Sequence, residues 1–387
     1  MAGAAEADHT SPSFFSRLKG ELAFLVGAAT TLLFYTFADE LLGDLSNPLI
    51  SIAVFLWLFV AMMWCAFGVV RHADALAHIL GEPYGTLILT LAVIGIEVSV
   101  IVAIMLTGAE NPTLARDTML AVLIIVLNGM VGLSLILGAL RHYEQAYNLQ
   151  GAQAYLSVVI PLATFILILP RFTTSTSTPT LNLGQEVMFA LVTIALYGVF
   201  LAIQTGRHRS YFQQPRNPIP SIPDEGTEED DGHGKPSGSV YFHALFLLLT
   251  LLPIVLLSKK LAVIVDHGIS VTGAPLALGG VLVAILILTP EALSAFRAAQ
   301  NNRLQRSVNI CLGSAVSTIG LTVPAVLAVA AFMDITVVLG LGDTDMVILI
   351  LTLVLSIVTF TGTRTTLLQG AVHLVVFVVY FFLLFQP

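Results

Sequence analysis

Two glutamates, Glu97 and Glu291, lie in the middle of long apolar runs, where an acidic side chain is costly. An ionised group near the centre of a bilayer costs about 2.5–3.5 kcal/mol on insertion scales, so such residues usually line a cavity, find a partner or bind ions. A carboxylate can hold either a metal cation or a proton. The chemistry that this pair could perform is therefore reversible binding of cations and protons inside a membrane. For each glutamate alone, a protonated side chain bonded to a neighbouring helix is the structural alternative.

The composition places these glutamates in an integral membrane protein. The 387-residue chain is 57% hydrophobic and 10% charged, with a mean hydropathy of +0.92, whereas soluble domains carry about 25% charged residues. The net charge of −8 owes much to one loop, and no basic stripe indicates nucleic acid. Cys65 and Cys311 lie in apolar runs, which argues against a disulfide or a metal cluster. The expected partners are the lipid bilayer, transported cations and protons.

Apolar runs long enough to cross a bilayer recur along the chain, since a span needs about 20 residues. We expect an all-α polytopic protein with about eleven transmembrane helices, the first retained because no cleavage site follows it. The eleven expected spans are residues 21–37, 49–70, 85–107, 115–140, 154–170, 184–204, 240–257, 275–297, 307–333, 343–362 and 366–385.

The basic residues and the longest polar stretch predict how these spans are organised. With the N-terminus in the cytoplasm, twelve of the sixteen lysines and arginines lie on the cytoplasmic side. An odd number of spans then places the C-terminus outside. We expect four regions: residues 1–48 with the leading helix, 49–204 and 240–387 as two five-helix blocks, and 205–239 as an acidic cytoplasmic loop. Five spans per block force the second block to enter with the opposite orientation, which is an inverted-topology repeat.

The two glutamates occupy matching places in these blocks. Glu97 lies about 48 residues after residue 49 and Glu291 about 51 after residue 240, each in the second span of its block. In inverted-repeat transporters, such paired positions converge near the bilayer midplane. Pro290 removes a backbone donor beside Glu291 and so frees a carbonyl that could help to coordinate a cation.

Polar residues at helical spacing around the glutamates are candidates for the lining of a site. Small and polar residues on one stripe also permit close helix packing, and for any single member packing is as good an explanation as ligation. The candidates are Thr90, Ser99 and Ser294 beside the glutamates, and Asn128, Asn309, Ser314 and Ser317 in the following span of each block.

The loop between the blocks carries an acidic run that lacks the alternating ligand pattern of an EF-hand. A solvated linker is the simplest interpretation. The alternative is a weak cation sensor that tunes activity. Its candidate residues are Asp224, Glu225, Glu228, Glu229, Asp230, Asp231 and His233.

The sequence does not support an enzyme. The string GLGD at residues 340–343 matches a motif of intramembrane aspartyl proteases, but that chemistry needs a second, facing aspartate. No HExxH, Walker A or GxSxG motif occurs either.

Several strings along the chain resemble the calcium/cation exchanger superfamily, and within it the cation/proton antiporter (CAX) family and its bacterial ChaA-type sodium-potassium/calcium–proton antiporters. GEPYGTLILTL at residues 81–91, leading to Glu97, resembles the first family motif, and TPE at 289–291 with GSAVSTIGLTVP at 313–324 resembles the second. Further ChaA-like strings are RHYE at 141–144, YGVFLAIQT at 197–205, HGKP at 233–236 and FTGTR at 360–364.

The resemblance implies a bacterial inner-membrane protein of eleven spans, with two inverted five-helix halves and no cofactor. It implies that Glu97 and Glu291 are the two essential glutamates and that Ser314 is a polar lining residue. The sequence departs from the family where Ile94, Gly95 and Ile96 precede the first glutamate, because an asparagine is usual there. Transport of Na⁺ or K⁺ therefore stays open beside Ca²⁺.

The function that we expect is secondary antiport of a metal cation (Ca²⁺ and/or Na⁺/K⁺) against protons, with Glu97 and Glu291 as the shared binding site. The alternatives within transport are a symporter or a passive cation channel. The alternative from another class is a membrane-embedded enzyme.

Overall fold

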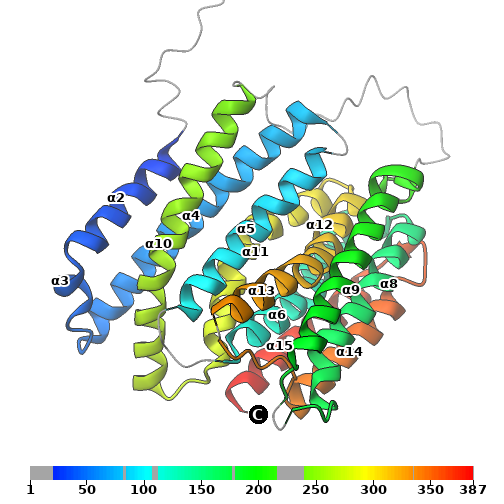
Figure 1. The fold of residues 1–387 in the computed structure, drawn as a ribbon. Coiled ribbons are helices and arrows are strands. Elements are labelled where there is room, and N and C mark those ends of the chain that lie inside the picture. Colours follow the sequence, from blue (N-terminus) through cyan, green and yellow to red (C-terminus); the bar gives the residue numbers. More distant parts are fainter. Residues whose placement is uncertain are drawn as a thin grey trace, which may run out of the picture.

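The fold comes from a computed structural model, which describes residues 21–81, 84–106, 112–176, 179–215, 239–333 and 335–386. This part of the chain is almost entirely helical, as the apolar runs predict, and its helices form one bundle (Figure 1). The expected all-α membrane architecture is confirmed. The seven acidic-loop candidates, Asp224 to His233, lie outside the described residues.

The first half of the chain begins with a leading helix and continues with a run of longer ones. Polar side chains start several of them: Asn47 accepts from the amide of Leu49 at the start of α4, and Asn182 forms a capping box with Gln185 before α9. The elements are α2 (Leu22–Thr36), α3 (Ala38–Leu42), α4 (Pro48–Leu80), α5 (Tyr84–Met105), α6 (Leu114–Ile124), η1 (Ile125–Met130), α7 (Val131–His142), β1 (Gln145–Ala146), α8 (Leu149–Ala163), η2 (Thr164–Ile168), η3 (Leu169–Arg171), α9 (Leu183–Ala202), η4 (Ile203–Arg207) and η5 (Arg209–Phe212).

The second half has a matching order of helices. Ser239 accepts from the amide of Phe242 at the start of α10, and Gly273, at a φ of 69°, ends that helix in the left-handed conformation that glycine adopts readily. The elements are α10 (Val240–Thr272), α11 (Ala277–Gln300), α12 (Leu304–Ser317), η6 (Thr318–Thr322), α13 (Val323–Met333), α14 (Asp343–Thr359), β2 (Arg364–Thr365) and α15 (Leu367–Phe385).

Eight helices in the described part of the chain are long and apolar enough to cross a membrane. Two shorter apolar helices, Leu22–Thr36 and Thr90–Met105, coincide with the first and third expected spans. The 17-residue α14 falls on the tenth expected span. Each expected span therefore lies on a helix, but the count of eleven crossings stays a prediction.

The opening helix of each block is longer than its apolar run predicts. We expected spans at 49–70 and 240–257, whereas α4 and α10 each have 33 residues. The hydropathy falls after residue 70, where Arg71 and His72 begin a polar stretch, but nothing in that stretch stops a helix. A helix of this length extends about 50 Å, more than the hydrocarbon core of a bilayer, so it tilts or projects beyond it.

The two halves interlock around the middle of the bundle. Helices α4 and α10 pack against each other along their length, with α2 against both (Figure 1). Helix α11 packs against α6 so closely that a Cβ on Gly280 would lie 2.7 Å from the Thr118 amide nitrogen. The short antiparallel pair β1–β2 joins a loop of the first half to a loop of the second.

The third long helix of each half contains a π-helical turn. In the first half this turn is η1, between α6 and α7, and in the second it is η6, between α12 and α13. Single π turns inside α-helices often occur at functional sites. Both turns lie on the helices that the sequence predicts to follow the two glutamates.

Candidate functional site

Glu97 is buried in the middle of α5 and is held by hydroxyl groups from the other half of the chain. Its side chain is 1% exposed. The Oε2 atom accepts hydrogen bonds from Thr318 Oγ1 at 3.1 Å and from Thr322 Oγ1 at 2.8 Å. The Oε1 atom is buried and has no hydrogen-bond partner among the described residues. One oxygen of this carboxylate is therefore positioned by the protein while the other stays available.

Glu291 lies in the middle of α11 and is less deeply enclosed than Glu97. The Ser314 hydroxyl on α12 lies within hydrogen-bonding range of its carboxylate, and the carboxylate of Asp74 on α4 acts on it electrostatically. Its Oε2 atom is buried without a hydrogen-bond partner in the described part of the chain. Glu291 thus also presents one acceptor oxygen that the protein does not satisfy.

The two glutamates lie on helices that contact each other. Helix α5 packs against α11, and Glu97 and Glu291 are near enough to interact electrostatically. Two like charges in a poorly solvated interior disfavour each other, so an empty pair is strained unless a cation or protons neutralise it. The arrangement can therefore bind cations or protons in competition.

Backbone features beside each glutamate add acceptors to this region. Pro290 directly precedes Glu291 and cannot donate to the carbonyl of Leu286, as a normal helical residue would. The π turn η6, which supplies Thr318 and Thr322, contacts α5. Carbonyl and hydroxyl oxygens are ligands that Ca²⁺ and other hard cations accept readily.

Three of the expected lining residues lie close to the glutamates along the chain but bond elsewhere or stay partly exposed. Thr90 bonds through its hydroxyl to Tyr197 on α9. Ser99 is half-buried in the turn after Glu97. Ser294 is exposed, and its hydroxyl donates to the carbonyl of Pro290 in its own helix at 3.1 Å.

The predicted lining residues of α12 separate into two groups. Ser314 lies beside Glu291, as described above. Ser317 is buried, but its hydroxyl donates to the carbonyl of Ser314 in the same helix at 3.1 Å. Asn309 lies farther toward the start of α12, where its amide donates to the Phe212 carbonyl at 2.7 Å and it accepts from Gln305 at 2.8 Å.

Asn128 belongs to a separate buried network, which lies between η1 and the helices α14 and α15. Its Nδ2 donates to Thr352 Oγ1 at 2.8 Å, and its Oδ1 lies 3.0 Å from His373 Nδ1. His373 Nε2 in turn lies 2.9 Å from Thr359 Oγ1. These contacts tie η1 to α14 and α15, so the structure does not bring Asn128 to the glutamate pair.

Sequence reasoning missed Thr318 and Thr322 as partners of Glu97. The two threonines are four residues apart in the expected span 307–333, so the sequence does show that their hydroxyls share one face of a helix. Which helix this face meets depends on contacts between the two halves. In the described part of the chain, no group of three or more His, Cys, Asp and Glu side chains could hold a metal ion.

The chain matches the family model described as sodium/calcium exchanger protein over residues 50–206 and 242–386. The two matched segments lie on either side of the polar stretch between the halves. The chain is 41% identical to the sodium-potassium/proton antiporter ChaA of Escherichia coli (strain K12) over 87% of this chain and 90% of that protein. It is 42% identical to a putative ionic transporter of Sinorhizobium fredii over 82% of this chain and 84% of that one.

Solved structures share the fold at much lower sequence identity. The crystal structure of the Ca²⁺/H⁺ antiporter YfkE superimposes with a TM-score of 0.70 at 16% identity, covering 95% of this chain and all of that one. That of the H⁺/Ca²⁺ exchanger CAX gives a TM-score of 0.61 at 13% identity, covering 94% of this chain and 88% of that one. Because the family model spans well over half of the chain and a close relative covers most of it, this protein belongs to the sodium/calcium exchanger family.

Proposed function

We propose that the protein is a secondary active antiporter that exchanges a metal cation for protons, with Glu97 and Glu291 as the shared binding site. The observation that carries this proposal is the pair of glutamates donated by contacting helices, each with a buried oxygen that has no hydrogen-bond partner among the described residues. Such oxygens are costly to bury unless a cation or a proton occupies them for part of the cycle.

The exchange follows from competition for these oxygens. A cation satisfies both carboxylates at once, and protons neutralise them separately, so loading by one excludes the other. An empty site carries unbalanced negative charge in a medium of low dielectric constant and reorients poorly. Only loaded forms then change the side of the membrane that they face, which enforces exchange and prevents a leak.

The names of the relatives support transport of monovalent cations and of the divalent cation Ca²⁺. One relative is a sodium-potassium/proton antiporter, and one similar structure is of a Ca²⁺/H⁺ antiporter. We propose that this chain transports Ca²⁺, Na⁺ or K⁺ against protons across the bacterial inner membrane. Its N-terminus would lie in the cytoplasm, its C-terminus outside, and the two blocks would be inverted repeats, as the basic residues and span order predict.

An assay in everted membrane vesicles tests the function class. Vesicles are acidified by respiration, a pH-sensitive dye reports the lumen, and Ca²⁺, Na⁺ or K⁺ is added in turn. Antiport predicts that at least one cation raises the luminal pH, whereas vesicles lacking the protein show no response. A channel would instead collapse the membrane voltage without moving protons, and that outcome would overturn the proposal.

The site assignment predicts that Glu97→Gln and Glu291→Gln each abolish exchange. Glutamine keeps the size of the side chain but cannot carry the charge that holds the cation or release a proton near neutral pH. The readout is the cation-induced dye response, with membrane insertion checked by the amount of protein in the vesicles. Glu40→Gln, at an exposed glutamate of α3, is the matched control and should exchange normally. Wild-type rates in either site variant would falsify the assignment.

A further inference from the structure

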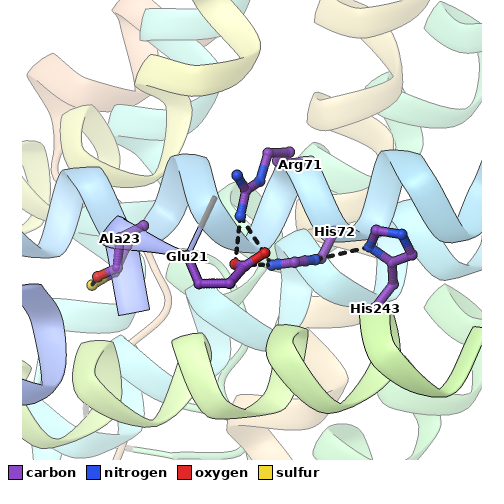
Figure 2. A network of polar contacts seen from close by, with 6 residues as sticks. Glu21, Ala23, Arg71, His72 and His243 are labelled. Carbon is purple, nitrogen blue, oxygen red and sulfur yellow. Dashed lines mark hydrogen bonds and ion pairs between the residues drawn. The ribbon is translucent and has the colours of Figure 1, made fainter. Parts of the chain in front are cut away.

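A second buried polar cluster lies where α10 begins, and it joins three helices (Figure 2). Glu21 immediately precedes α2, Arg71 and His72 lie on α4, and His243 lies in the first turn of α10. Glu21 Oε2 accepts from Arg71 Nη2 at 2.6 Å and lies 2.9 Å from His72 Nε2. His72 Nδ1 lies 3.0 Å from His243 Nδ1. All except Arg71 are buried, with His72 only 1% exposed.

These contacts restrict where the hydrogens of the two imidazoles can lie. His72 Nε2 lies 2.9 Å from Glu21 Oε2, which only accepts, and 3.2 Å from Arg71 Nη2, which only donates. We place a hydrogen on Nε2 because the carboxylate is nearer and Arg71 Nη2 already donates to that carboxylate. A single hydrogen must also lie between the two Nδ1 atoms. In the neutral pair it belongs to His243, which leaves His243 Nε2 as a bare acceptor. That nitrogen is buried and makes no hydrogen bond within the described part of the chain.

The cluster has room for one additional proton. It can reside on His72 Nδ1, with His243 then protonated at Nε2 only, or on His243 Nε2, and both placements keep the contacts of His72 with Glu21 and with His243. Among the charged groups that act on His243, a charged His72 and Arg71 oppose an added proton, whereas Glu21 favours it. The added proton is therefore better placed on His72, which contacts the Glu21 carboxylate directly.

Aromatic rings pack against His72, and its polar neighbours favour the ionised form of Glu21. The rings of Phe242 and Phe246 pack against His72. Burial by itself would raise the pKa of the Glu21 carboxyl, but the hydrogen bond and charge of His72, followed by the charge of Arg71, hold it below its usual range. The carboxylate therefore remains available as the counter-charge of an imidazolium.

We propose that Glu21, Arg71, His72 and His243 form a proton-binding site, separate from the glutamate pair, that fixes α2 against α4 and α10 more firmly when occupied. The proposal rests on the antiport function in one respect, because it makes this site a regulator of exchange. Protonation of His72 adds the attraction between an imidazolium and a carboxylate to the hydrogen bond that already joins His72 to Glu21, and such an attraction is stronger in a buried site than in water.

The packing of α2 explains how this change can reach the transport helices. Helix α2 lies against both long helices, and a Cβ on Gly27 would come within 2.4 Å of Cys65 Sγ on α4 and 3.0 Å of Pro253 on α10. Farther along α2, the Tyr35 hydroxyl donates to the Leu256 carbonyl of α10 at 3.1 Å. Helix α2 thus contacts both α4 and α10, so firmer docking at Glu21 would restrain the movement of these helices relative to each other.

The direction of the effect follows from the proposed orientation, which puts this cluster on the cytoplasmic side. Exchange that brings protons inward acidifies that side. Occupation of the site by a proton then slows exchange, which prevents excessive acidification. We expect activity to increase as the cytoplasmic pH rises through the range in which the histidine pair loses its proton.

The first test measures proton binding without transport. Purified full-length protein with ¹⁵N-labelled histidine is titrated by NMR between about pH 5.5 and 8.5, the range in which histidines commonly change charge. His72→Gln and His243→Gln identify the two sets of signals. We expect both sets to shift together in one transition, also in the Glu97→Gln background, where transport is absent. If both histidines stayed neutral over the whole pH range, the proposal would be wrong, and this result would not depend on whether the protein is an antiporter.

The second test measures the effect on exchange. The rate is compared at pH 6 and pH 8 on the side of the membrane where α10 begins. Loss of the proton across this range should increase the wild-type rate severalfold beyond any increase in His72→Gln and His243→Gln. The control is His78→Gln, at an exposed histidine of α4, the helix that also carries His72. Its rate should depend on pH as the wild-type rate does. Equal pH profiles in all four proteins would remove the regulatory role.

Discussion

At the scale of single residues, the two glutamates differ in how the protein holds them. Glu97 Oε2 receives two hydroxyl hydrogen bonds, from Thr318 and Thr322, whereas Glu291 has the Ser314 hydroxyl in range and the Asp74 carboxylate nearby. Two donors on one oxygen fix the orientation of the Glu97 carboxylate and leave its other oxygen available for the proposed cation. A carboxylate that is already fixed in place loses less conformational entropy when a cation binds to it.

This difference predicts that Thr322→Val weakens cation binding. Valine keeps the shape of the side chain but removes the donor of the 2.8 Å hydrogen bond, so the carboxylate loses its orientation. A hydrogen bond to a charged group is worth about 1.5 kcal/mol or more, so the apparent KM for the cation should rise roughly tenfold. The measurement is the dye response over a range of cation concentrations.

Ser294→Ala is the matched control for the threonine variant. Its hydroxyl is exposed and, within the described segments, donates to the carbonyl of Pro290 one turn earlier. Its removal should leave the KM within about twofold of the wild type, because a surface substitution of this kind seldom changes much. A larger effect in Ser294→Ala than in Thr322→Val would show that the threonine hydroxyl does not position Glu97.

At the scale of helices, the position of Glu291 depends on the close contact between α11 and α6. Gly280 lies eleven residues before Glu291, about three turns along α11, and a Cβ there would lie 2.7 Å from the Thr118 nitrogen and 2.9 Å from the Asp117 carbonyl carbon. These are backbone atoms of α6, which cannot move aside as a flexible side chain could. A larger residue must therefore displace one helix from the other.

We accordingly predict that Gly280→Ala destabilises the protein and reduces exchange. Overpacking of a close contact typically costs about 1–3 kcal/mol, and displacement of α11 carries Glu291 with it. Thermal unfolding in detergent should occur at a lower temperature than in the wild type. The neighbouring Gly279→Ala is the control, because its Cβ would meet nothing nearer than 3.8 Å. If both variants unfolded at the same temperature, the contact would not be needed.

At the scale of the whole molecule, the two halves contact each other at several places. The hydroxyls that hold Glu97 come from the second half, the opening helices α4 and α10 pack against each other, and β1 pairs with β2 across the halves. The site therefore exists only when both halves are folded together. Relative movement of the halves changes the site directly, which suits a transporter that must open to each side in turn.

The sequence predicts the helices well and directs attention to the two glutamates, in both cases for physical reasons. Long apolar runs must form helices in a bilayer, and a carboxylate within such a run is conspicuous because it is costly. The ends of α4 were less visible, because residues 71–80 are polar enough to leave the membrane yet remain helical.

The partners of the glutamates could not be predicted from spacing within one span. Helical periodicity shows which residues share a face, but not which helix that face meets. Asn128 and Thr322 have similar places in corresponding helices, and yet Asn128 bonds to Thr352 and His373 while Thr322 bonds to Glu97. The choice is made by contacts between segments more than 200 residues apart.

The most direct test of the central claim is a count of the protons released when a cation binds to the purified protein. Calorimetric titration with Ca²⁺, Na⁺ or K⁺ near pH 7, in two buffers with different ionisation enthalpies, gives this number and the affinity together. A site shared by cations and protons predicts proton release on binding in the wild type, with binding greatly weakened in Glu97→Gln and Glu291→Gln. Cation binding without proton release, or with unchanged affinity in these two variants, would contradict the shared site.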